Sequence, residues 1–226
     1  MKPRFRPTRR ALDDLLAVMA TLRSPRGCPW DREQDHLTLR HHAVEEAYEL
    51  MDAIESGDDH EMADELGDLL LQVVFHCQLA RERQAFDFEQ VARRIVDKLV
   101  RRHPHVFAGA DAKTVDAVWA QWENIKTAEK QGTRHARPSA LDGIPRHLPA
   151  LLRAEKLVKK ARKAKLLPAM NGRASAKSRT AFARELFGLA ARVQALGWSA
   201  EELLRAETQK QERSLRRRER SRAPKS

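Results

Sequence analysis

Apolar side chains recur every three to four positions along most of the chain, the spacing at which residues share one face of an α-helix. No stretch alternates apolar and polar side chains over more than a few residues, as a half-buried strand would. The pattern therefore predicts an all-α protein. The expected helices cover residues 9–23, 38–55, 60–83, 87–102, 114–130, 147–165, 179–196 and 199–220.

A long interval rich in glycine, proline and serine interrupts this pattern at residues 132–149. Such a composition is typical of a connection between domains. We therefore expect an N-terminal domain over residues 1–135, a linker over 136–150 and a C-terminal region over 151–226.

The helices expected at 38–55 and 60–83 both carry carboxylates beside an apolar stripe. At about 100° per residue, Glu46 and Glu49 fall on one flank of the first stripe. Glu65 and Asp68 fall on the matching flank of the second. Because the connecting turn is short, the two helices form an antiparallel hairpin in which the four carboxylates can converge. The stripes expected to be buried contain Ala47, Leu50, Met51 and Ile54, then Leu66, Leu69, Leu70, Val73, Val74 and Cys77.

Four carboxylates close together repel one another by about 1 kcal/mol or more for each near pair, so a cation is expected among them. Oxygen ligands of high charge suit a hard divalent ion, which favours Mg²⁺, with Mn²⁺ as a substitute, over zinc. The alternative is that these acidic residues lie on solvated helix flanks and bind nothing.

Charge is distributed unevenly along the 226 residues. The whole chain has 43 basic and 32 acidic residues, but residues 152–226 alone have 21 basic against 7 acidic ones. Such a basic region favours a polyanionic partner, and weak nucleic-acid binding is expected there. No apolar run is long enough to span a membrane, and Cys28 and Cys77 are not spaced like metal ligands, so we expect a reducing, cytoplasmic setting.

The acidic hairpin belongs to a larger set of motifs. Glu45-Glu46-x-x-Glu49 followed by Glu65-x-x-Asp68 resembles the EExxE/ExxD motif of the MazG-type nucleoside triphosphate pyrophosphohydrolases, which are all-α enzymes. Further segments resemble MazG in the same order over roughly residues 11–160. These are Gly27-Cys-Pro-Trp-Asp-Arg-Glu-Gln34, the run from Asp97 to Phe107, Trp122-Glu-x-x-Lys126 and Leu141-Asp-Gly-Ile-Pro-Arg146.

The resemblance assigns roles to residues. It implies that Glu46, Glu49, Glu65 and Asp68 hold the metal, with Glu45 as a secondary candidate and the nearest general base. Two cations four residues apart on one helix, Lys98 and Arg102, match the family's phosphate-binding positions. Expected nucleotide contacts are Trp122 and Lys126, with Trp30, Asp31 and Gln34 as further contacts. Asp35 departs from the pattern, because the family usually has Thr there.

Full-length MazG proteins resemble a duplication, and the C-terminal region here is expected to be a degenerate second copy. Ala181 and Arg184 stand about where the second copy would carry metal carboxylates. No cation site is expected around them. Related proteins pair their helices across a two-fold axis, so a homodimer is expected.

The function implied by the resemblance is Mg²⁺-dependent conversion of NTP or dNTP to NMP or dNMP and pyrophosphate, in a house-cleaning role. Two alternatives stay open at this point. One is a non-catalytic helical protein that binds nucleotides or nucleic acid through its basic C-terminal region. The other is a catalytically inactive sensor that has kept nucleotide binding.

Overall fold

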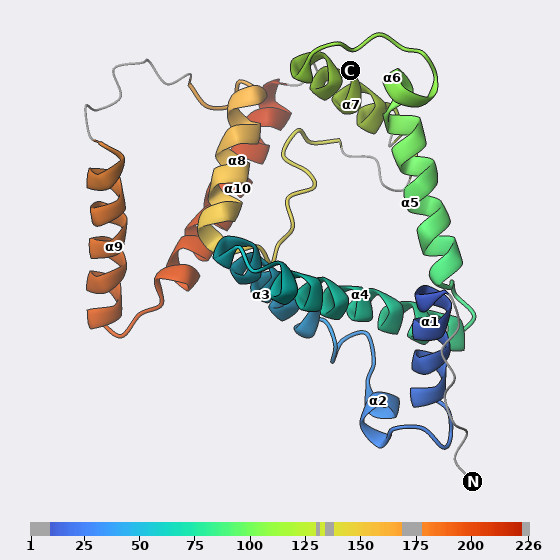
Figure 1. Ribbon diagram of the computed structural model, residues 1–226. Helices are drawn as coiled ribbons and strands as arrows, with labels where there is room; N and C mark the ends of the chain where they lie inside the picture. Colours follow the sequence, from blue (N-terminus) through green and yellow to red (C-terminus); the bar gives the residue numbers. More distant parts are fainter. Residues whose placement is uncertain (1–9, 130–131, 134–137, 169–177, 223–226) are drawn as a thin grey trace. The chain divides into compact units, whose positions relative to one another are not determined.

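The computed structural model describes residues 10–129, 132–133, 138–168 and 178–222. Every regular element in these ranges is a helix, which confirms the all-α fold (Figure 1). The chain divides into two compact units, residues 1–122 and 123–226, and the division falls inside α7. The helices are α1 Ala11–Leu22, α2 Pro29–Glu33, α3 His42–Ser56, α4 Asp59–Glu82, α5 Phe88–Arg102, α6 Pro104–Phe107, α7 Val115–Ala128, α8 Ala150–Lys163, α9 Arg179–Ala195 and α10 Ala200–Arg222.

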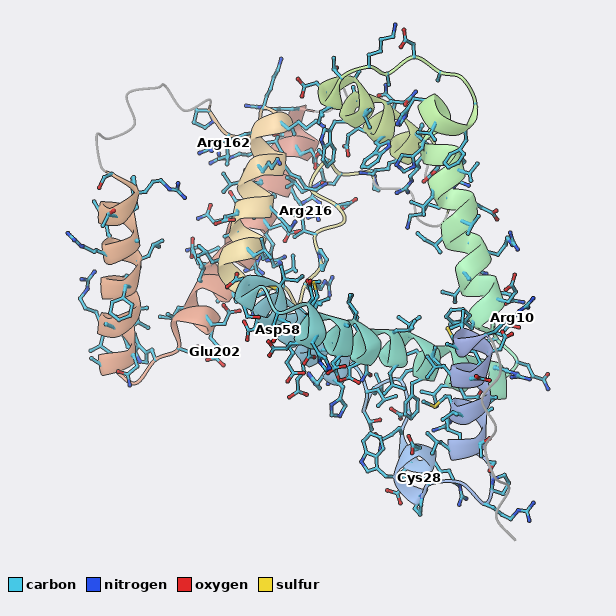
Figure 2. All side chains as sticks on the ribbon, in the orientation of Figure 1. Arg10, Cys28, Asp58, Arg162, Glu202 and Arg216 are labelled. Carbon is cyan, nitrogen blue, oxygen red and sulfur yellow. The ribbon has the colours of Figure 1, made fainter. Side chains whose placement is uncertain are left out.

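A tight turn makes α3 and α4 the predicted antiparallel hairpin. Gly57 ends α3 with a left-handed backbone (φ 76°), which a residue with a side chain adopts only at a cost. Asp58, labelled in Figure 2, starts α4 because its side chain accepts hydrogen bonds from the backbone N–H groups of His60 and Glu61. The chain therefore reverses direction between two adjacent residues, Gly57 at the end of α3 and Asp58 at the start of α4.

The core of the first unit lies where α1 packs against the second half of α4. Met19 and Leu39 meet three buried side chains of α4 there, namely Val74, Phe75 and Leu79. This core fixes the hairpin through the second half of α4.

The expected burial of the hairpin's apolar stripes is wrong for most positions. Met51, Ile54 and Leu66 are at least half exposed, and Ala47, Leu70 and Val73 are exposed as well. Val74 and Cys77 are buried as expected. The physical reason is that, among the described residues, the first half of α4 packs mainly on α3, so the outer sides of both helices stay exposed.

The segment between α1 and α3 is tied closely to both its neighbours. A Cβ on Gly27 would lie 2.0 Å from the carbonyl oxygen of Leu22, so only glycine fits this approach. Arg23 anchors the segment: its guanidinium pairs with Glu82 at 2.7 Å and donates to the carbonyl oxygens of Asp31 and Gln34. The segment that contains α2 is thereby held against α4.

In the second unit, α8 and α10 lie side by side and run parallel. The backbone N–H of Ala150, at the start of α8, donates to Glu201 at the start of α10, and Arg222 donates to the carbonyl of Lys165 just beyond α8. Leu157 and Leu215 are buried between these helices. None of the described helices is long and apolar enough to cross a membrane.

Candidate metal and nucleotide site

Three carboxylates of the hairpin converge in the first unit. One oxygen each from Glu46 and Glu49 of α3 and from Glu65 of α4 lies within 4.8 Å of the others. The arrangement follows from the i, i+3 spacing on α3 and from the turn that brings α4 alongside. Asp68, one turn beyond Glu65, is not a member of this close group, but its charge acts on both Glu46 and Glu65.

The crowding changes the protonation behaviour of the group. Burial, followed by the charges of Asp68 and Glu49, raises the pKa of Glu46 above its ordinary value. Burial and the neighbouring charges of Glu49 and Asp68 likewise raise the pKa of Glu65. Glu46 and Glu65 therefore hold their protons more tightly than isolated carboxylates do, and a bound cation would oppose this effect.

The donor set fits a hard divalent cation. Oε2 of Glu65 is buried and has no hydrogen-bond partner, although a carboxylate oxygen removed from water normally has one. The converging groups are all oxygens, and no histidine or cysteine is among them. This combination matches Mg²⁺ or Mn²⁺ better than Zn²⁺.

A buried amide adjoins the carboxylates. Gln72, on α4, is only 7% exposed, and its Nε2 donates to Oε1 of Glu46 at 3.3 Å. Its own oxygen has no hydrogen-bond partner. Gln72 is not among the site residues predicted from the sequence, although it is the one polar residue in the apolar run from Leu69 to Phe75 and follows Asp68 by one helical turn.

A pocket of about 250 Å³ opens beside Glu46. Two of the predicted nucleotide contacts, Trp30 and Asp31, line this pocket together with Gln72. Its lining is Met19, Leu22, Trp30, Asp31, Leu39, His42, Glu46, Leu71, Gln72 and Phe75. The structure thus brings the indole and the carboxylate of the Cys-Pro-Trp-Asp segment next to the acidic group.

Three further residues that the sequence singled out, Glu45, Gln34 and Asp35, interact with residues close to them in the chain. Glu45 is exposed and pairs with Nδ1 of His42 at 3.3 Å, outside the close carboxylate group. The Gln34 side chain donates to the carbonyl of Trp30 at 3.0 Å, which braces the end of α2. Asp35 accepts backbone hydrogen bonds from Thr38 and Leu37, and these bonds lower the pKa of its carboxyl.

The predicted phosphate-binding residues lie elsewhere in the chain. Lys98 and Arg102 occupy the second half of α5, which leaves the C-terminal end of α4 (Figure 1), whereas Asp68 lies about 20 Å back along α4 from that end. Trp122 packs edge-on against His103 just beyond α5, with 4.9 Å between ring centroids. Lys126 follows on α7 and pairs with Glu123 at 3.2 Å. One chain does not bring Lys98 and Arg102 to the carboxylates.

Comparison with known proteins gives a consistent family assignment for this region. Residues 34–107 match the family described as "MazG nucleotide pyrophosphohydrolase domain". The chain is 51% identical over 150 residues to the nucleoside triphosphate pyrophosphohydrolase of Escherichia coli (strain K12), a match that covers 66% of this chain and 56% of that protein. It is 45% identical over 145 residues to the nucleoside triphosphate pyrophosphohydrolase/pyrophosphatase MazG of Thermotoga maritima, covering 64% and 54% of the two chains.

A mycobacterial protein extends the comparison. The nucleoside triphosphate pyrophosphohydrolase of Mycobacterium tuberculosis is 41% identical over 157 residues, which are 69% of this chain and 46% of that protein. The chain therefore spans about half the length of the curated relatives it matches.

Proposed function

Starting from a MazG nucleotide pyrophosphohydrolase domain at residues 34–107, we propose that this protein hydrolyses nucleoside triphosphates, as NTP or dNTP, to the monophosphate and pyrophosphate with Mg²⁺, for which Mn²⁺ can substitute. The observation that carries the proposal is the close group of Glu46, Glu49 and Glu65, with an unpartnered buried oxygen on Glu65. The names of the relatives support the same reaction.

Glu46, Glu49, Glu65 and Asp68 would hold the metal. A divalent ion in such a site lowers the pKa of a bound water and offsets the negative charge that develops on phosphate oxygens. Gln72 fixes the orientation of the Glu46 carboxylate through its Nε2 hydrogen bond. The raised pKa values of Glu46 and Glu65 make this group costly to ionise without a cation, so binding of the ion and release of protons are coupled.

Glu45 is the nearest further carboxylate, and we keep it as the proposed general base. Its side chain is exposed and its partner is the imidazole of His42 rather than a member of the close carboxylate group, so it is available to accept a proton from water.

The proposed phosphate contacts are Lys98, Arg102 and Lys126, and the proposed base contacts are Trp30, Asp31, Gln34 and Trp122. Lys98 and Arg102 lie away from the carboxylates of their own chain. The proposal therefore includes a homodimer, in which a second copy brings another α5 alongside.

Uncovered apolar side chains support the dimer. We call these residues the apolar set. In a single chain, each of their side chains has at least 39% of its surface exposed to water. The set is Val44, Tyr48, Met51 and Ile54 of α3, Leu66, Leu70 and Val73 of α4, and Ile95, Val96, Leu99 and Val100 of α5.

Two further expectations complete the proposal. The basic second unit binds nucleic acid weakly, because exposed cations at the C-terminal ends of α8 and α10 attract phosphate. The protein acts in the cytoplasm, with which the free thiols of Cys28 and Cys77 agree.

A pyrophosphate-release assay across the NTP and dNTP panel tests the proposal. Purified protein releases pyrophosphate and monophosphate with Mg²⁺, less or equally well with Mn²⁺, and EDTA abolishes the reaction. If no nucleotide of the panel yields pyrophosphate with either metal, the proposed hydrolysis is contradicted. The alternative of a non-catalytic binding protein is then favoured.

A further inference from the structure

Arg23 joins three helices of the first unit through a single, largely buried side chain. It lies at the end of α1, and only 9% of its side-chain surface is exposed. Its Nε and Nη2 each donate to one oxygen of the Glu82 carboxylate at 2.7 Å. Its Nη1 donates to the carbonyl oxygens of Asp31 and Gln34 at the end of α2. The guanidinium therefore bridges α2 and α4 directly.

The guanidinium is fixed to α4 at two points. Besides the pair with Glu82, its Cζ lies 5.6 Å from the ring centroid of Phe75, which is buried in the core of the unit. Phe75 and Glu82 are two turns apart on one face of α4. A planar cation over an aromatic ring, with a carboxylate bound at two of its nitrogens, has little freedom to rotate. Arg23 thereby presents Nη1 to α2 at a defined point.

The helix that receives this contact is too short to be stable by itself. α2 has five residues, whereas an isolated helix shorter than about 12 residues is marginal in water. The last carbonyls of a helix lack partners within it, and Arg23 donates to two carbonyls at this end of α2. A cation also opposes the partial negative charge at a helix C-terminus. The position of α2 on α4 thus depends on Arg23.

The side chains of α2 connect this contact to the candidate site. Trp30 and Asp31 line the pocket beside Glu46, and Phe75 forms part of its wall. The same helix α4 supplies carboxylates of the proposed metal site. A shift of α2 on α4 would therefore change the distance between the indole in the pocket and the metal ligands.

We propose that Arg23 is a positioning residue, which holds Trp30 and Asp31 at the distance from the metal ligands that a bound nucleotide requires. Arg23 is not among the residues that line the pocket, so it acts through α2. The inference rests on the proposed function for the identity of the ligand, but the position of Trp30 is measurable without substrate.

Arg23→Lys separates this role from the ion pair with Glu82. Lysine keeps the charge, but one ammonium group cannot reproduce the planar fork that reaches the carboxylate and two carbonyls together. We expect KM for NTP hydrolysis to rise about tenfold and kcat to stay within about threefold, because base stacking is lost while the metal ligands are unchanged. Calorimetric titration with AMP, GMP, CMP and UMP in EDTA shows the same loss of affinity without turnover.

Fluorine nuclear magnetic resonance of the full-length protein labelled with fluorotryptophan follows α2 itself. The chain has four tryptophans, and Trp30→Phe identifies the resonance of Trp30. In Arg23→Lys this resonance shifts or broadens, whereas those of Trp119, Trp122 and Trp198 keep their positions. An unchanged Trp30 resonance, or equal changes in all four resonances, would overturn the proposal.

Two control variants exclude a general loss of stability as the cause. Arg81→Lys makes the same chemical change at an exposed residue of α4 outside this pocket and leaves KM unchanged. Glu82→Gln weakens the ion pair but keeps an oxygen that accepts from Arg23, so α2 stays in place and KM stays within about twofold. If Arg23→Lys does not fold, as judged by circular dichroism, Arg23→Gln must raise KM and move the Trp30 resonance in the same way.

Hydrolysis and binding measured together separate this inference from the proposed function. If no NTP yields pyrophosphate while Arg23→Lys moves the Trp30 resonance and weakens monophosphate binding, the proposed function fails and the positioning role stands. If pyrophosphate is released and Arg23→Lys leaves both KM and monophosphate affinity unchanged, the proposed function stands and the positioning role fails.

Discussion

At the scale of single residues, the position of a carboxylate on α3 decides what it does. Glu49 belongs to the close group, whereas Glu55 is an exposed residue of the same helix outside that group. Glu49→Gln removes one charged ligand, and we expect kcat/KM for NTP hydrolysis to fall at least about a hundredfold. Glu55→Gln makes the same chemical change elsewhere on the helix and leaves the rate within about threefold.

Steady-state kinetics and thermal unfolding of Glu49→Gln and Glu55→Gln test this prediction. Loss of activity in Glu49→Gln with an unfolding temperature at or above that of the parent protein supports a ligand role, since removal of one of several repelling charges does not destabilise the fold. Equal effects of the two substitutions would contradict the assignment.

The ion pair between Arg23 and Glu82 predicts a pH dependence of stability. The hydrogen bond from Arg23 lowers the pKa of Glu82 below its ordinary value of 4.5. A carboxyl whose pKa is lower in the folded state stabilises it at pH values above the unfolded pKa, and this contribution declines as pH falls below 4.5 toward the folded pKa. Glu82→Gln therefore lowers the free energy of unfolding at pH 7 by about 1 kcal/mol, because Glu82 is partly exposed.

Urea unfolding at pH 7 and at a pH near 3 tests this effect. The difference between the parent protein and Glu82→Gln shrinks at the lower pH. A difference that is the same at both pH values would assign the effect to packing rather than to the charge of Glu82.

At the scale of helices, the apolar set on α3, α4 and α5 predicts self-association. Met51→Lys and Val73→Lys place charges among side chains that a second copy would cover, so we expect the proposed dimer to dissociate toward a monomer near 25.9 kDa. Val115→Lys is the control, since Val115 is 73% exposed at the start of α7 and outside the apolar set. Light scattering at micromolar concentration measures the mass, and a parent protein that is already monomeric would contradict the dimer.

The long helices could be predicted from the sequence because each repeats its apolar face over at least three turns. The bounds expected at 60–83 and 87–102 lie within a residue of Asp59–Glu82 and Phe88–Arg102. The short helices α2 and α6 could not be predicted, because fewer than two turns carry no periodicity. The sequence also could not tell whether an apolar stripe is covered within its own chain, and this is where the burial expected for Met51 and Leu66 went wrong.

The candidate site was predicted only in part. Spacing on two helices correctly brought Glu46, Glu49 and Glu65 together, since a short turn leaves the hairpin little freedom. The position of α5 depends on packing at the far end of α4, which no local pattern encodes, so the sequence could not show where Lys98 and Arg102 lie relative to the carboxylates. Gln72 interrupts an apolar run, and that interruption is the signal that could have revealed it.

At the scale of the whole molecule, the basic residues are concentrated in a unit that has its own core. In that unit, α8 and α10 end on the same side, and exposed arginines lie near the C-terminal end of each helix. Truncating α10 is a poor test of their role because Leu215, which is 4% exposed, lies in the core of the unit. Surface substitutions keep that core intact.

A variant with Arg162, Arg217, Arg218 and Arg220 all replaced by Gln binds DNA or RNA more weakly at low salt. The slope of log affinity against log salt decreases by up to about 3 if all four cations contact phosphates. NTP turnover stays within about threefold, a change of less than 1 kcal/mol in the barrier. Fluorescence anisotropy over a salt series measures the slope, and an unchanged slope would contradict nucleic-acid binding by this unit.

The identity of the bond that is cleaved tests the central claim most directly. ³¹P nuclear magnetic resonance of ATP incubated with the purified full-length protein and Mg²⁺ distinguishes the possible products in one spectrum. If the carboxylates of α3 and α4 form the active site of a pyrophosphohydrolase, the resonances of AMP and pyrophosphate grow together, and neither appears with Glu49→Gln or in EDTA. Growth of ADP and inorganic phosphate instead, or of AMP and pyrophosphate at the same rate with Glu49→Gln, would contradict the claim.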